Sequence, residues 1–125
     1  MRTEEIPRNA WNRTFNAFNA MHEGWLVSVE VLNSGIGAQM EVENLPLMSV
    51  SAAATDVDPA VTISAGDAAD RHISHTIRGA RRVHIERTDE GADAAMQIES
   101  EDGTLTILRF KSARLPETVD GFVRY

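Results

Sequence analysis

Histidine and arginine are concentrated in one short stretch of this chain, residues 71–87. It holds three of the four histidines and five arginines, and Glu86 is its only acidic residue. The histidines are His72, His75 and His84, and the arginines are Arg71, Arg78, Arg81, Arg82 and Arg87. Residues 14–70, in contrast, contain eight acidic residues and no lysine or arginine. A surface that faces anions, or that complements a second copy, is therefore expected within residues 71–87.

The histidines are candidate metal ligands, since imidazole binds zinc and similar ions, and Asp67 or Asp70 could complete a ligand set. Successive side chains of a strand point to opposite faces, so one strand cannot aim residues 72 and 75 at one ion. The remaining metal set is His72, His84 and Asp70. The alternative, which we favour, is a buried, hydrogen-bonded His75 with the other two histidines on the surface.

The five arginines are the candidate ligand or partner patch. A cluster would bind a phosphate, a nucleotide or an acidic protein surface, because guanidinium pairs well with planar anions. The alternative is that they pair with the acids of residues 14–70 on neighbouring strands, which the acidic composition favours.

Other motifs are weaker. Gly35 and Gly37 match the start of a dinucleotide-binding motif, but they lead into a strand pattern, so a hairpin is favoured. Asp56, Asp58, Asp67 and Asp70 do not have the spacing of a calcium loop, so a turn and a solvated loop are favoured. The side chains of Ser74 and His75 diverge in a strand, which does not suit a nucleophile and its base. The chain also lacks the common hydrolase, metalloprotease and nucleotide-binding motifs. Whether it is an enzyme stays open, and the pattern favours a non-enzymatic protein with no cofactor.

The periodicity predicts one helix followed by a β-sheet. Trp11, Phe15, Phe18 and His22 fall on one stripe of a helix over residues 7–22, and Asn19 falls on the polar side. Period-two alternation then predicts about eight short strands within residues 25–110. Their ranges are 25–31, 36–43, 47–53, 61–65, 72–77, 82–87, 94–98 and 104–110. Residues 111–125 form an irregular tail.

This pattern predicts a mainly β protein with one N-terminal helix. We expect a mostly antiparallel sheet curled into a small barrel or sandwich, with the helix packed on one face or opening. The 125 residues form a single domain, residues 1–125, with a net charge of −7 and no cysteine. This composition excludes disulfides and thiolate metal sites, and disfavours binding to nucleic acid. No run is apolar enough to cross a membrane and no signal peptide is evident, so a cytoplasmic protein is expected.

Several stretches resemble a small bacterial family catalogued only as a domain of unknown function. They are EGWLVSVEVL at residues 23–32, IGAQ at 36–39, LPL at 45–47, TDEGADAA at 88–95, IES at 98–100 and LRF at 108–110. The resemblance implies a single-domain bacterial protein and brings no activity, cofactor or catalytic residue.

Three functions fit these patterns. The favoured one is a non-enzymatic binding or regulatory module that acts through protein–protein contacts and associates with itself or with a protein partner. The second is a small β-barrel that binds a ligand or a metal, or acts as an enzyme, through the His72, His75 and His84 region. The third, a small RNA-binding barrel, is disfavoured by the acidic charge and the single tyrosine.

Overall fold

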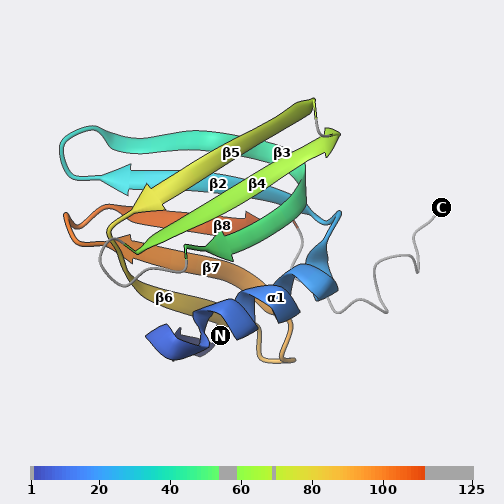
Figure 1. Cartoon of the computed structure of the whole chain (residues 1–125), viewed down its shortest axis with the longest axis horizontal. Coiled ribbons are helices and arrows are strands. Elements are labelled where there is room, and N and C mark those ends of the chain that lie inside the picture. Colours follow the sequence, from blue (N-terminus) through green and yellow to red (C-terminus); the bar gives the residue numbers. More distant parts are fainter. Residues whose placement is uncertain (1, 54–58, 69, 112–125) are drawn as a thin grey trace.

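Alternating apolar residues build a sheet of eight strands in the computed structural model, which describes residues 2–53, 59–68 and 70–111 (Figure 1). The elements in chain order are β1 (Arg2–Ile6), η1 (Arg8–Ala10), α1 (Trp11–His22), β2 (Leu26–Asn33), β3 (Gly37–Ala52), β4 (Ala60–Ala68), β5 (Arg71–Arg78), β6 (Ala80–Arg87), β7 (Asp93–Ser100) and β8 (Leu105–Phe110). The mainly β class with one N-terminal helix is confirmed. The expected tail lies outside the described residues, except for Lys111.

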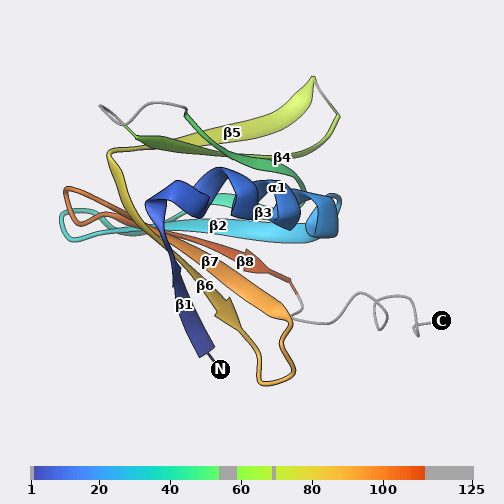
Figure 2. The ribbon, with the colours of Figure 1, turned by 60° about the horizontal axis from the view of Figure 1, so that its bottom comes forward.

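The sheet is open, and the predicted barrel or sandwich is wrong. The strand order is β1-β6-β7-β8-β2-β3-β4-β5, and every neighbouring pair is antiparallel. A barrel would need its first and last strands to pair, whereas β1 pairs with β6 and β5 pairs with β4. Instead of a second sheet, α1 covers the apolar face. It lies between the β4–β5 end and the β1–β6–β7 end of the sheet (Figure 2).

Residues 25–110 form seven strands, one fewer than predicted, and the eighth strand of the sheet is β1. The predicted strands 36–43 and 47–53 are a single strand, the 16-residue β3. Its first part pairs with β2 as far as Pro46, and its last part, from Leu47, pairs with β4. β1 has no alternating apolar pattern that would predict it, because only Ile6 of that strand is buried.

The predicted aromatic stripe of the helix is confirmed. Trp11, Phe15, Phe18 and His22 are the buried residues of α1. They pack against the apolar face of the sheet, to which β2, β8, β7 and β6 contribute Val29, Leu108, Met96 and Ile85. The indole Nε1–H of Trp11 donates to the Ile6 carbonyl at 3.0 Å, which fixes the helix beside β1. Within the described residues, no helix has the length and apolarity needed to span a membrane.

Asn19 holds the helix to β3, although its position on the helix predicted an exposed side chain. Its Nδ2–H donates to the Val50 carbonyl at 2.9 Å, and its Oδ1 accepts from the Val50 backbone N–H at 2.8 Å. One amide therefore satisfies both backbone groups of Val50, a residue whose side chain is buried.

We expect Asn19→Ala to lower the free energy of unfolding by about 1–3 kcal/mol, because it leaves the backbone groups of Val50 without these partners. Urea denaturation followed by circular dichroism measures the loss. The matched control is Asn16→Ala on the exposed side of the same helix, which should change stability by less than about 0.5 kcal/mol. Equal losses in the two variants would contradict a holding role for Asn19.

Candidate functional site

The structure does not bring the predicted metal ligands together. His72 lies on β5 and His84 on β6, and these strands are not neighbours in the sheet. His84 faces outward as predicted, and its Nε2 is 3.9 Å from Oε1 of Glu5 on β1. Asp70 lies in the turn before β5. Within residues 2–53, 59–68 and 70–111, no three residues of the His, Asp and Glu types are grouped to hold an ion.

His75 lies on the predicted face of β5, but it is only partly buried. It is opposite Ile63 of β4, and Ile77 of the same face is buried. The His75 side chain is 25% exposed, and its Nδ1 is 3.9 Å from Oε1 of Glu41 on β3. Imidazole and carboxylate are therefore close enough to attract each other electrostatically when the ring is protonated.

The five arginines are spread over β5 and β6, and the ion pairs seen among the described residues include those of Arg71, Arg82 and Arg87. Arg71 lies 3.2 Å from Asp67 in an exposed pair, and Arg82 lies 3.9 Å from Glu99. Arg87 pairs with Glu4 and with Asp93. Asp67 is the only one of these partners that belongs to residues 14–70, where the sequence placed the acids. Arg78 and Arg81 are both exposed, on either side of Gly79.

A polar network around His22 escaped the sequence analysis. His22 is 2% exposed at the last turn of α1, and its ring contacts those of Phe18, Trp25 and Phe110 at 4.6–4.7 Å between centroids. Its Nδ1 lies 2.9 Å from the Phe18 carbonyl, and its Nε2 lies 3.5 Å from Oδ2 of Asp93. Oδ1 of Asp93 accepts from Arg87 Nε–H at 3.1 Å, and Arg87 also contacts Glu4. The one feature of the sequence that pointed to this network is the position of His22 on the apolar stripe of the helix.

The hydrogen bond to Phe18 fixes the tautomer of His22. A carbonyl can only accept, so Nδ1 carries the proton, and Nε2 of the neutral ring faces the Asp93 carboxylate with a lone pair. Protonation of Nε2 would turn this contact into an ion pair. Burial nevertheless lowers the pKa of His22 below its ordinary value, since it disfavours the charged form, while the Phe18 carbonyl and Asp93 act in the opposite direction.

The His22 network is structural in kind. A general base must come within hydrogen-bond distance of its substrate, and a ring that is 2% exposed and enclosed by three aromatic rings offers no such access. Its members come from α1, β7, β6 and β1, so the network joins the end of the helix to one edge of the sheet.

The described residues define a class of mainly β proteins, in which an N-terminal helix covers one face of an open, eight-stranded antiparallel sheet. The model of a family of unknown function, DUF5335, matches residues 2–118, and the chain belongs to that family. An uncharacterized protein of Aquifex aeolicus (strain VF5) is 30% identical to this chain over 118 residues, which cover 94% of this chain and 100% of the relative. No solved structure matches significantly.

Because the folded state holds the pKa of His22 below its unfolded value, stability is greatest above the unfolded pKa and falls as the pH drops toward the folded one. We therefore expect the free energy of unfolding to decrease between about pH 7 and pH 5. His22→Phe keeps an aromatic ring and removes the titration, so its decrease should be smaller.

Denaturant unfolding at each pH measures these differences, and an NMR titration of the His22 ring protons measures its pKa directly. A His22 pKa above the ordinary value near 6.5 would contradict the expectation.

Proposed function

We propose that this chain is a non-enzymatic binding or regulatory module that acts through protein–protein contacts, with a second copy of itself or with another protein. The observation that carries the proposal is the exposed cationic strand β5, which forms one edge of the open sheet. A sheet edge of this kind offers backbone hydrogen-bonding groups to another chain.

The arginine-rich corner next to this edge supports the proposal. We define the corner as Arg78, Arg81 and Arg82, which surround Gly79 where the chain passes from β5 into β6. Gly79 has a φ of 64°, which favours glycine, and its carbonyl accepts from the Glu101 backbone N–H at 2.9 Å. All three arginines are exposed. On a protein with a net charge of −7, such a corner attracts an acidic protein surface and orients it.

The alternative of a ligand- or metal-binding site has less support. It needs histidines from β5 and β6 to act together, and these strands lie apart in the sheet order. The proposal involves no cofactor, nucleic acid or membrane.

We expect the double variant Arg81→Glu and Arg82→Glu to weaken self-association, or capture of a partner, by about tenfold, because reversed charges repel an acidic surface. Native mass spectrometry of the purified protein, and affinity capture from the source cell followed by sequencing of the bound chains, measure the two forms of association. Circular dichroism checks that the fold is retained.

The matched control reverses two arginines elsewhere, Arg2→Glu on β1 and Arg13→Glu on α1, with the same change in net charge. Association should persist in this control. Unchanged masses and unchanged partners in the Arg81 and Arg82 double variant would overturn the proposal.

A further inference from the structure

We propose that the edge of β5 binds an extended segment of another protein, in which acidic and apolar residues alternate. This inference rests on the proposed function and specifies its partner. The segment would add a ninth strand to the sheet beside β5, on the side away from β4.

The backbone of β5 suits such an addition. β5 is an eight-residue strand that pairs with β4 on one side, and it is the last strand in the order of the described sheet. All of its residues except His75 and Ile77 are exposed. The opposite edge, β1, is five residues long and carries Glu4 and Glu5, so it does not offer the same length or charge. An added strand gains affinity from main-chain hydrogen bonds and specificity from alternate side chains.

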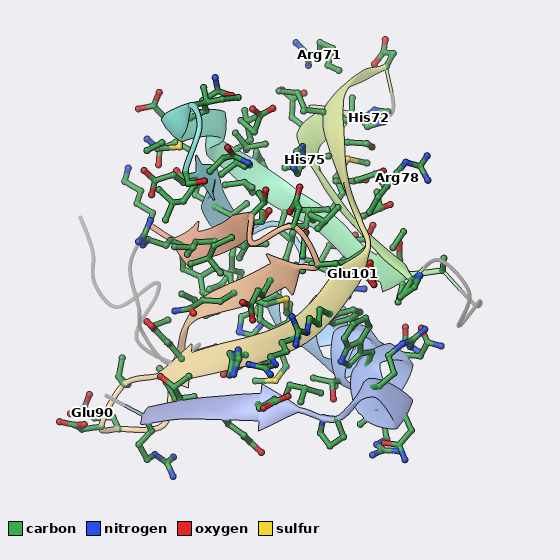
Figure 3. All side chains as sticks on the ribbon, turned by 90° about the vertical axis from the view of Figure 1, so that its left-hand side faces the viewer. Arg71, His72, His75, Arg78, Glu90 and Glu101 are labelled. Carbon is green, nitrogen blue, oxygen red and sulfur yellow. The ribbon has the colours of Figure 1, made fainter. Side chains whose placement is uncertain are left out.

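The two faces of β5 differ in chemistry, and this difference sets the alternation of the segment. His72 and Arg78 point to one side of the strand and His75 to the other (Figure 3). The first side is the outer face, where the Ser74 and Thr76 hydroxyls lie 2.8 Å and 3.0 Å from those of Ser64 and Thr62 on β4. This face is polar, with His72 at one end and Arg78 at the other.

The other face carries Arg71 at its start and is apolar around Ile73, where an acid is disfavoured. Ile73 is 43% exposed there, while Ile77 is buried. Glu41 already lies beside His75, so a second carboxylate would meet a like charge. An apolar side chain on this face would instead cover Ile73 and remove apolar surface from water.

The charge of β5 favours an acidic partner. The strand contains two arginines, two histidines and no acidic residue. Arg78 lies on the outer face, where the acids of the segment are placed, whereas Arg71 lies on the other face and contacts Asp67. Pairing of β5 with β5 of a second copy would instead bring together two strands that both carry arginines and no acidic residue. The net charge of −7 opposes nucleic acid. The favoured occupant is therefore an extended acidic segment of a different protein.

The test uses fluorescently labelled eight-residue peptides with the full chain, and anisotropy as the readout. A peptide alternating glutamate and valine should bind, while one alternating lysine and valine should bind at least about tenfold more weakly. A glutamate–valine peptide N-methylated at every second residue along one edge lacks the N–H groups that a strand donates. Two such peptides are made, one methylated at the glutamates and one at the valines. The peptide whose methylated edge faces β5 should lose binding.

Variants of the protein test the surface itself. Arg78→Glu, on the outer face, should weaken binding of the glutamate–valine peptide about tenfold, while the control Arg13→Glu on α1, with the same change in net charge, should bind like the wild type. Ile73→Lys should also weaken binding, and Met21→Lys, at another exposed apolar residue on α1, should not. Circular dichroism confirms the fold of each variant.

Three results would overturn the inference: no binding of the glutamate–valine peptide, undiminished binding of both N-methylated peptides, or equal binding of a single-stranded oligothymidylate of the same length. If partner capture still depends on Arg81 and Arg82 in such a case, the proposed function survives with a different contact surface. If neither capture nor peptide binding is seen, both proposals fail.

Discussion

The packing of α1 against the sheet is the interaction on which the rest of the structure depends. An open sheet has one apolar face that must be covered, and here a single helix contributes the buried rings of Trp11, Phe15 and Phe18. Without that cover the buried residues of β2, β6, β7 and β8 would face water. The helix thus takes the place that a second sheet would fill in a sandwich, and leaves two strands of the sheet as edges.

Polar contacts fix where the helix lies on this face. Apolar contacts have little directional preference, so they alone would allow the helix to slide. Trp11 donates to the backbone at the end of β1, Asn19 satisfies Val50 of β3, and His22 faces Asp93 of β7. Trp11 lies at the start of α1, and Asn19 and His22 lie one turn apart at its end, so the contacts fix both ends of the helix.

The same openness shapes the surface. A closed barrel has no free strand edge, whereas this sheet ends at β1 and β5. β1 is short and acidic, and Arg87 and His84 of β6 lie against its glutamates. β5 is longer and cationic. The proposed contact with a protein partner follows from this asymmetry. The acidic remainder of the chain repels an acidic segment, so such a segment is directed to β5.

The sequence by itself determined the local elements, because their signals are periodic and local: the stripe from Trp11 to His22, the alternation of the strands, and the outward position of His84. Contacts between distant segments were decided by the tertiary structure. No local pattern places Asn19 on Val50, His22 on Asp93, or Arg87 between β1 and β7. Local patterns also do not show that β5 and β6 lie apart in the sheet, or that Pro46 lies within one long strand. Register and strand order depend on which segments bury each other's apolar faces, and that is a property of the whole chain.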